Sequence, residues 1–209
     1  MNTLLRGLFR LLGWVVGLGL VAVAILYLFF IRAVQVGHNG MAPTLLAGEQ
    51  AVLWRNADIE MGDIALCEHP GRKGQFVMGR VVGKPGMRIE APRGQLQIEG
   101  STVDRDVQGD VRFFDTTADR TVTMVRGVEI LGNTDHEYFI RKDDHLRIRP
   151  TEVTAGLYLL GDNRSNRADD SRTFGEVDPD ECIGTVFMRL RPNPDDPNEL
   201  GHGWLQWIE

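Results

Sequence analysis

A run of 21 residues without a charged side chain, Leu11 to Ile31, constrains the fold of this chain more than any other feature. At about 1.5 Å per residue, a helix of that length covers roughly 30 Å, the thickness of the hydrocarbon core of a bilayer. A cleaved signal peptide has a shorter apolar core that ends in small residues, whereas this run continues through the bulky Tyr27, Phe29 and Phe30. The sequence therefore predicts one uncleaved transmembrane helix over residues 11–31, and its uniform apolar character argues against a buried core helix.

The residues that flank and end the run predict which way it crosses the membrane. Arg6 and Arg10 lie on the short N-terminal side, so the positive-inside rule keeps residues 1–10 in the cytoplasm and sends the larger C-terminal part across. Trp14 near one end of the run and Tyr27 near the other suit the two interfaces of the bilayer. We therefore expect a single-pass membrane protein whose first partner is the lipid bilayer.

The composition of the whole chain narrows the remaining classes. Of its 209 residues, 43% are hydrophobic and 25% are charged, which is enough apolar material for one domain besides the anchor. The formal net charge of −6 argues against a nucleic-acid partner, because such proteins usually carry a basic surface. The histidines show no paired spacing, so we expect no metal site, and nothing in the sequence indicates a cofactor.

Downstream of Arg32 the pattern changes from a helical run to short segments typical of β-strands. These segments contain Val, Ile and Leu and are separated by Gly, Pro, Asp or Asn turns. We expect strands at 50–54, 63–67, 75–82 and 87–90, a hairpin at 94–104, further strands at 122–125, 137–141 and 157–160, and a closing strand at 182–190. The predicted fold is mainly β: an antiparallel β domain behind an N-terminal transmembrane helix, with little other helix.

Two features of the β domain leave alternatives open. In the tail, residues 191–209, Trp204 and Trp207 either lie at the bilayer interface or pad the core, and the sequence favours neither. The two cysteines, Cys67 and Cys182, are too few for a disulfide scaffold and have apolar neighbours. An oxidising compartment would permit a bridge between them, but we expect two buried free thiols.

The stretch from Gly161 to Val177, GDNRSNRADDSRTFGEV, follows a predicted strand and is dense in polar side chains. Its carboxylates alternate with guanidinium groups, so Asp162, Asp169 or Asp170 could each pair with an arginine of the same loop, while asparagines bond backbone groups. Such bonding makes a long loop rigid enough to form the wall of a site. For a generic run of this composition, a solvated surface loop is the competing interpretation.

This loop closely resembles the GDNR…DSR…G signature of bacterial type I signal peptidases, membrane-anchored serine endopeptidases that use a Ser/Lys dyad. GMAPTL at 40–45 resembles the nucleophile box of that family, and FVMGRVVGKPG at 76–86 resembles the box that carries the catalytic lysine. The three boxes follow the family's order. The resemblance implies a β core of signal-peptidase type at 32–90 and 156–190, a smaller inserted β subdomain at 91–155, and a bacterial inner-membrane location with a periplasmic or otherwise extracytoplasmic domain.

The resemblance fails at the residues that carry out the chemistry. Gly40 stands where the family has its nucleophilic serine, Gly79 where it has its general-base lysine, and His38 where a serine contributes to the oxyanion hole. Glycine provides neither nucleophile nor base, so no catalytic residue is predicted, although the backbone N–H of Gly40 could still act as a donor. Lys84 is five residues beyond Gly79 and would face the opposite side of a strand. His38 could act as a base but lacks a serine or thiol beside it in the sequence, so we interpret it as a polar loop residue.

The family binds an extended leader segment beside a sheet edge, largely through backbone hydrogen bonds, and those bonds do not need the dyad. We predict that a groove survives between segment 34–40 and strand 76–82, lined by Val36, His38, Gly40, Met41, Val77 and Gly79. The residues predicted to hold the shape of the neighbouring loop are Gly161, Asp162, Asn163, Arg164, Asp170 and Arg172.

These residues favour one function and leave two others open. The leading hypothesis is a catalytically inactive, signal-peptidase-like protein that binds or scaffolds a preprotein, a pilin-like subunit or a larger membrane complex. The first alternative is an active signal peptidase I that cleaves leader peptides with a relocated dyad. The second is a structural accessory subunit of a membrane protein complex.

Overall fold

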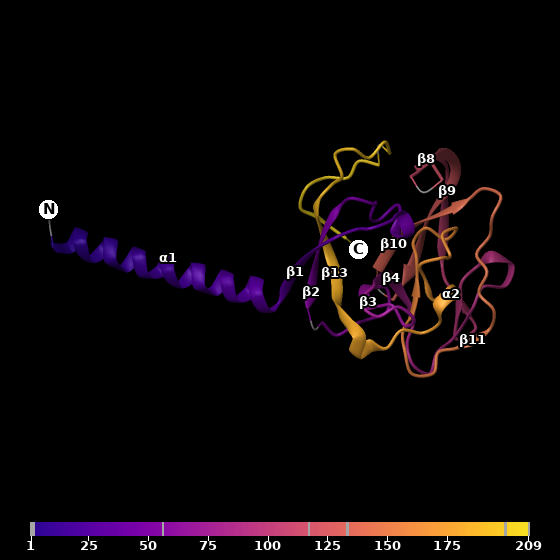
Figure 1. Cartoon of the computed structure of the whole chain (residues 1–209), viewed down its shortest axis with the longest axis horizontal. Coiled ribbons are helices and arrows are strands. Elements are labelled where there is room, and N and C mark those ends of the chain that lie inside the picture. Colours follow the sequence, from indigo (N-terminus) through magenta and orange to yellow (C-terminus); the bar gives the residue numbers. More distant parts are fainter. Residues whose placement is uncertain (1–2, 56, 117, 133, 199, 209) are drawn as a thin grey trace.

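The computed structural model describes residues 3–55, 57–116, 118–132, 134–198 and 200–208. Met1 and Asn2 of the predicted cytoplasmic segment lie outside these ranges, as do single residues of the predicted core, inserted subdomain and tail. The described chain forms one long helix, α1 (Thr3–Phe29), followed directly by a β domain (Figure 1). Outside α1, its only α-helix is the four-residue α2 (Ser171–Phe174). The predicted mainly β fold is confirmed.

Helix α1 contains the predicted membrane-spanning run. Within the described residues, one helical stretch, Gly7–Phe29, is long and apolar enough to cross a membrane, with a mean hydropathy of 2.5 and no part of it buried in protein. The helix ends at Phe29 rather than at the predicted residue 31, because Ile31 already pairs with Trp54 in the first strand pair. The Arg55 side chain caps this end by donating to the Leu28 carbonyl oxygen at 3.1 Å. Because β1 begins at Ile31, two residues after the end of α1, no linker separates the helix from the β domain.

The main sheet of the domain is antiparallel throughout. Its strand order is β1-β2-β13-β3-β4-β12, with β14 paired to the far end of β13. The strands are β1 (Ile31–Gln35), β2 (Gln50–Arg55), β3 (Ile64–Glu68), β4 (Phe76–Gly83), β12 (Tyr158–Leu160), β13 (Cys182–Arg191) and β14 (Gln206–Trp207). Strands from the first and the last part of the chain therefore alternate in one sheet. The strands predicted at 50–54, 63–67, 75–82, 157–160 and 182–190 are all present in it.

The main sheet buries apolar side chains on both faces, as the pleat of its strands requires. In β3, Ile64 and Leu66 join a cluster with Val36 and Met78, whereas Ala65 and Cys67 join a second cluster on the other face. A strand buried on both faces shows a continuous apolar run rather than an alternation, which is the pattern of Ile64–Cys67.

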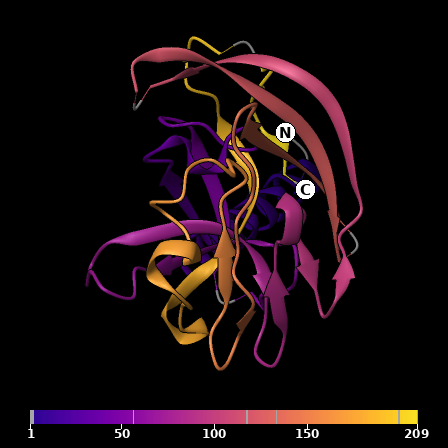
Figure 2. The ribbon, with the colours of Figure 1, turned by 90° about the vertical axis from the view of Figure 1, so that its right-hand side faces the viewer.

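Two smaller sheets contain the middle of the chain. The four-stranded one has the order β11-β5-β6-β7 and consists of β5 (Arg88–Glu90), β6 (Gln97–Ile98), β7 (Ser101–Thr102) and β11 (Thr151–Glu152). It contains the predicted hairpin, with Gln97 opposite Thr102. The three-stranded one has the order β10-β9-β8 and consists of β8 (Arg105–Asp115), β9 (Arg120–Leu131) and β10 (Thr134–Arg141). Figure 2 shows β8 and β9 as a long hairpin that bends over one end of the domain.

Strand β8 was not predicted. Its sequence RDVQGDVRFFD is rich in charged residues, and most of its side chains are exposed, so the strand lacks the alternation that sequence patterns detect. It pairs with β9 over ten register positions, shifted by a bulge between Val107 and Gly109. Gly109 has φ of +132°, a conformation that favours glycine and that increases the local bend of the hairpin.

The two cysteines form a disulfide, Cys67–Cys182, so the prediction of two free thiols is wrong. They are 115 residues apart in the sequence, but β3 and β13 are neighbours in the main sheet. Cys182 stands directly opposite Cys67 in the register, with their Cα atoms 3.8 Å apart. The pairing follows from sheet topology, which the sequence around either cysteine does not reveal.

The tryptophans of the tail do not pad the core. Trp204 is 66% exposed and Trp207 is 72% exposed. Trp207 packs against the Phe187 ring, with centroids 5.5 Å apart, and the guanidinium of Arg191 lies over Trp204. Phe187 in turn contacts Trp54 beside the end of α1. The exposed rings thus belong to the end of the domain at which the helix enters, and their placement at a bilayer interface stays a prediction.

Candidate functional site

Gly40 lies in a single 3-10 turn, η1 (Asn39–Met41), that follows β1. His38 caps this turn: its backbone is extended and its Nδ1 accepts the N–H of Gly40 at 3.0 Å. A Cβ atom added to Gly40 would lie 2.7 Å from the imidazole, so the ring occupies the space of the missing side chain. The Gly40 N–H, expected to remain as a donor, is already bonded by His38.

Gly79 lies in the middle of β4, opposite Ala65 of β3 and beside β12. A Cβ atom at this position would lie 2.8 Å from the Cβ of Leu159 and 3.5 Å from the backbone nitrogen of Leu160. Leu159 is 1% exposed and belongs to the core cluster on this face. Because a Cβ atom moves only with its backbone, β4 and β12 would have to separate before position 79 could carry a side chain.

The loop after β12 brings the distant boxes of the sequence together. The backbone N–H of Asn163 donates to the Gly40 carbonyl oxygen at 3.0 Å, and the Asn163 side chain donates to the Asn39 carbonyl oxygen at 3.1 Å. Gly161 makes this approach possible, because a Cβ atom there would lie 2.6 Å from the Gly40 carbonyl oxygen. The loop therefore docks on the turn that contains Gly40.

A buried ion pair fixes the start of this loop to β4. Arg80 and Asp162 are 1% and 0% exposed, and the guanidinium donates from Nε and Nη2 to the two carboxylate oxygens at 2.9 and 2.8 Å. Thr44 donates to the same carboxylate. Burial would raise the pKa of Asp162, but the charge and hydrogen bonds of Arg80 outweigh it and lower that pKa. Asp162 thus pairs with a strand residue, not with an arginine of its own loop.

Arg164 also reaches out of the loop. Its Nη2 donates to Glu129 of β9 at 2.7 Å and lies 3.4 Å from Nε2 of His136 in β10. All three side chains are buried, and the guanidinium also lies over the Tyr138 ring. The pKa of His136 is lowered to about 3 by burial and by the charges of Arg80 and Arg164, against the opposing charge of Asp162. The folded protein therefore holds this imidazole neutral.

We expect the protein to lose stability in mild acid because of His136. Between pH 6.5 and about pH 3 the unfolded chain protonates this imidazole while the folded state does not, so stability falls as the pH falls. The expected loss between pH 7 and pH 5 is about 2 kcal/mol, as measured by urea unfolding of the full chain in detergent.

His136→Gln removes this titration and should flatten the dependence of stability on pH. Carboxylates titrate mostly below this window, so they add little to it. The exposed His145→Gln is the matched control and should keep the slope of the unmodified protein. If His136→Gln kept that slope as well, the neutral buried imidazole would not be its source.

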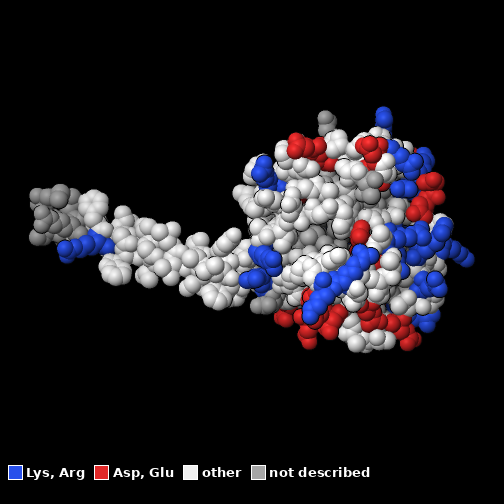
Figure 3. Space-filling model, viewed as in Figure 1, with Lys and Arg blue, Asp and Glu red and all other residues white. Residues whose placement is uncertain are grey.

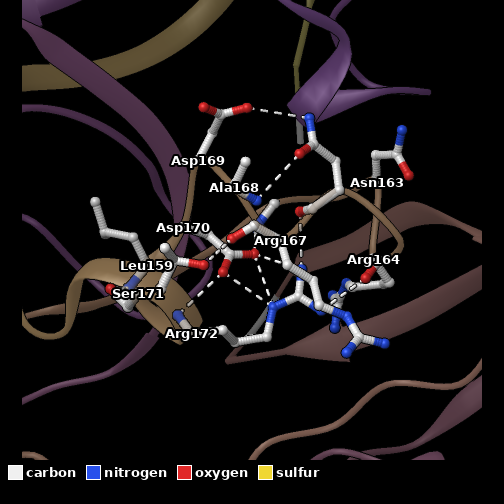
Figure 4. A network of polar contacts seen from close by, with 12 residues as sticks. Leu159, Asn163, Arg164, Arg167, Ala168, Asp169, Asp170, Ser171 and Arg172 are labelled. Carbon is white, nitrogen blue, oxygen red and sulfur yellow. Dashed lines mark hydrogen bonds and ion pairs between the residues drawn. The ribbon is translucent and has the colours of Figure 1, made fainter. Parts of the chain in front are cut away.

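Bonds within the loop also hold its shape around Asp170 and Arg172, as predicted (Figure 4). Arg172 donates to both carboxylate oxygens of Asp170 and to the carbonyl oxygens of Arg164 and Asn166. Asn166 donates to Asp169 at 3.1 Å. Asp170 also caps α2 by accepting the backbone N–H of Arg172 at 3.0 Å. The guanidinium of Arg172 therefore fixes the path of the loop beside Gly40.

Two cavities flank His38. The first, which we call the His38 groove, has a volume of about 250 Å³ and is lined by Arg32, Val34, Gln35, Val36, Gly37, His38, Met41, Leu66, Phe76, Met78 and Ile183. It contains Val36, His38 and Met41 of the predicted groove. Val77 lies on the opposite face of β4 in the core, so Met78 and Phe76 line the groove in its place.

The second cavity, of about 360 Å³, lies on the other side of the imidazole. It is lined by residues of β8, β9 and the 161–177 loop, among them Phe113, Met124, Asn166 and Asp169. The Asp169 carboxylate lies 3.6 Å from Nδ1 of His38. His38 thus stands between an apolar cavity and a more polar one.

Among the described residues, the atoms nearest to the two glycine positions offer no hydroxyl, thiol or amine in place of the dyad. The atoms nearest to a Cβ at Gly40 belong to His38 and Asn166, and those nearest to a Cβ at Gly79 belong to β12. None of them is a hydroxyl, a thiol or an amine of lysine. Lys84 follows β4 and pairs with Glu60 at 2.8 Å on the surface. The described residues also contain no cluster of three or more metal-ligating side chains.

Comparisons with known proteins show which family this chain is similar to. The family model described as signal peptidase, peptidase S26, matches residues 9–191. Signal peptidase IB of Staphylococcus aureus (strain Mu50) is 26% identical over 191 residues, which are 88% of this chain and 91% of that protein. Signal peptidase I U of Bacillus subtilis (strain 168) is 26% identical over 171 residues, 79% of this chain and 78% of that protein. A crystal structure of a signal peptidase I from Enterococcus faecalis is 24% identical and covers 62% of this chain and 97% of its own, with a TM-score of 0.39. The family match includes both glycine positions and the loop that docks on them.

Proposed function

Since this chain belongs to the signal peptidase family, peptidase S26, we propose that it is a catalytically inactive, membrane-anchored member that binds an extended peptide without cutting it. The observation that carries the proposal is the state of the two dyad positions. Both are glycine, and the space of each missing side chain is taken by His38 or by Leu159. Acyl transfer by a Ser/Lys dyad needs a hydroxyl and a neutral amine in contact, and glycine at positions 40 and 79 supplies neither.

Binding is supported by what the site retains. The His38 groove keeps apolar walls, including Met41, Phe76 and Met78, that suit small alkyl side chains of a peptide. Strand β1, which leads into the groove, is first in the order of the main sheet, so within the described chain its outer edge has no partner strand. An extended peptide can add to such an edge through backbone hydrogen bonds.

The partner is expected on the extracytoplasmic side of the membrane. Arg10 lies in the N-terminal part of α1, directly before the uncharged run 11–31, and favours a cytoplasmic N-terminus. The Cys67–Cys182 disulfide suits an oxidising compartment, as outside the cytoplasm. A preprotein, a pilin-like subunit or a permanent subunit of a membrane complex would each present an extended segment there.

The test uses the full chain in detergent and a fluorescent leader-type peptide with an Ala-x-Ala sequence. We expect saturable binding by fluorescence anisotropy, and mass spectrometry should find the peptide intact after long incubation. Phe76→Glu places a charge in the groove and should weaken binding at least tenfold. Phe76 is 48% exposed, so the variant is expected to fold.

Val107→Glu is the matched control, because Val107 is a similarly exposed apolar residue on β8 outside the groove. It should bind like the unmodified protein.

Cleavage of the peptide, with contaminating peptidases excluded, would overturn the proposal in favour of an active leader peptidase, which family membership supports as the second candidate. Absence of binding would favour a structural subunit.

A further inference from the structure

A second, larger cleft lies away from the His38 groove. It has a volume of about 740 Å³ and separates the segment 147–151 from residues 167–176 of the docked loop and α2. Its lining includes four arginines, Arg147, Arg149, Arg167 and Arg172, and one carboxylate, Glu176. The chain as a whole carries a net charge of −6, so this concentration of positive charge is local. We call it the arginine cleft.

The hydrogen bonds of the lining show which charges face the cleft. Arg172 is fully engaged with Asp170 and two carbonyl oxygens. Arg167 pairs with the Asp144 carboxylate at 2.9 Å, and both side chains are partly exposed to solvent. Arg147 donates to His145, and its charge also helps to lower the pKa of Asp144. Among the described residues, no ion pair joins Arg147 or Arg149 to a carboxylate. Both of these arginines are exposed, so two guanidinium groups are left to bind an external anion.

The carboxylate of the cleft does not neutralise them. Glu176 accepts the backbone N–H groups of Thr154, Ala155 and Gly156, which together span one turn of the chain. Burial would raise the pKa of Glu176, but these backbone bonds lower it. Its charge is therefore bound to the backbone rather than to the arginines of the cleft.

The position of the cleft limits what can occupy it. Basic side chains gather at the end of the domain remote from α1 (Figure 3), where α2 and β11 also lie (Figure 1). Arg55 and Trp54 hold the opposite end of the domain against the end of the membrane helix. With α1 inserted in a membrane as predicted, the arginine cleft lies at the end of the domain remote from the bilayer surface and its lipid headgroups.

We propose that the arginine cleft binds an acidic segment of a partner protein, whose Asp or Glu side chains pair with Arg147, Arg149 and Arg167. The volume of the cleft, about 740 Å³, is large enough for several side chains, and guanidinium groups bind carboxylates in bidentate geometry. Complementary charge of this kind accelerates association and selects partners. This site is separate from the His38 groove and does not depend on it.

The probe is a fluorescein-labelled peptide rich in glutamate, with a glutamine-rich peptide of the same length for comparison. Binding to the full chain in detergent is measured by anisotropy at low and at physiological salt. We expect saturable binding of the acidic peptide that weakens as salt rises, and a loss of at least tenfold in Arg147→Gln/Arg149→Gln. Binding of the leader-type peptide in the groove should not change in this variant.

Arg88→Gln/Arg120→Gln is the matched control, because it removes the same charge from two exposed arginines that line no part of the cleft. It should bind the acidic peptide like the unmodified protein. An equal loss in this control, equal binding of the glutamine-rich peptide or no binding at low salt would overturn the proposal. A competition experiment then compares inorganic phosphate, vesicles with anionic lipid and unlabelled acidic peptide at equal concentrations of negative charge. If phosphate or the vesicles displaced the labelled peptide at a lower concentration than the unlabelled acidic peptide did, the proposal would be overturned in favour of a phosphate site.

Discussion

Restoring the two missing side chains alone, as Gly40→Ser/Gly79→Lys, is expected to leave the protein without measurable peptidase activity. At position 40 the imidazole of His38 must move, which a terminal ring can do by rotation. At position 79 the Cβ atom of Leu159 lies 2.8 Å from the new Cβ, and it can move only with the backbone of β12. Overpacking of this kind costs about 1–3 kcal/mol and displaces the new lysine from the serine.

Activity should appear when the filling residues are removed as well. Adding His38→Ser and Leu159→Gly to the two restored residues opens both spaces, and the stem of the lysine then fills part of the volume left by Leu159. We expect cleavage of a fluorogenic leader peptide at a kcat/KM at least about 100-fold above that of the double variant, which corresponds to about 2.7 kcal/mol of transition-state stabilisation.

The variant His38→Ser/Leu159→Gly, without the dyad, is the control for both results. It should be inactive, and its thermal unfolding shows how much stability the loss of Leu159 costs on its own. Equal activity of the double and the quadruple variants would contradict the inference that His38 and Leu159 block the site. An inactive quadruple variant that folds normally would show that further parts of the active site have been lost.

The sequence was sufficient to predict those elements whose structure follows from the pattern of neighbouring residues. Ile64 to Cys67 form a continuous apolar run between turns, and such a run is typical of a strand buried on both faces. The loop from Gly161 was predicted to hold its shape by internal bonds, and Asp170 with Arg172 does so because the two residues are only two positions apart in a capped turn. Local patterns of this kind need no knowledge of the rest of the fold.

Other features depend on which segments the topology brings together, so the sequence could not reveal them. Glycine at 40 and 79 showed that side chains were missing, but not that His38 and Leu159 fill their places. The Cys67–Cys182 pairing arises from the neighbouring positions of β3 and β13. The partner of Arg164 is Glu129, a residue of β9 in a part of the sequence without any recognisable motif.

The same distinction explains how the loop beside the dyad positions can keep its shape with glycine at both of them. In the docked loop, Asn163 bonds the backbone of Asn39 and Gly40, and those bonds do not depend on the side chain at position 40. Arg80, next to Gly79, points to the opposite face of β4 and anchors the loop through Asp162. The scaffold around the dyad positions therefore rests on backbone bonds and on the Arg80–Asp162 pair, neither of which needs a side chain at position 40 or 79.

Asp162→Ala is expected to lower the free energy of unfolding by about 3–5 kcal/mol, because it leaves the buried guanidinium of Arg80 without its carboxylate. Thr44 loses an acceptor in the same variant. Urea unfolding of the full chain in detergent, followed by tryptophan fluorescence, measures the change.

The control is Lys142→Ala, which removes one partner of the ion pair between Lys142 and Asp110. These side chains are 64% and 45% exposed, so the variant should lower the free energy of unfolding by less than about 1 kcal/mol.

The double variant Arg80→Met/Asp162→Leu separates charge burial from packing. If the cost of Asp162→Ala comes from the buried charge, replacing both partners by apolar side chains of similar volume should recover most of the lost stability. A double variant as unstable as Asp162→Ala would instead assign the loss to the hydrogen bonds that Arg80 and Asp162 make to Gly62 and Thr44, and the loop would depend on those bonds rather than on the pairing of the two charges.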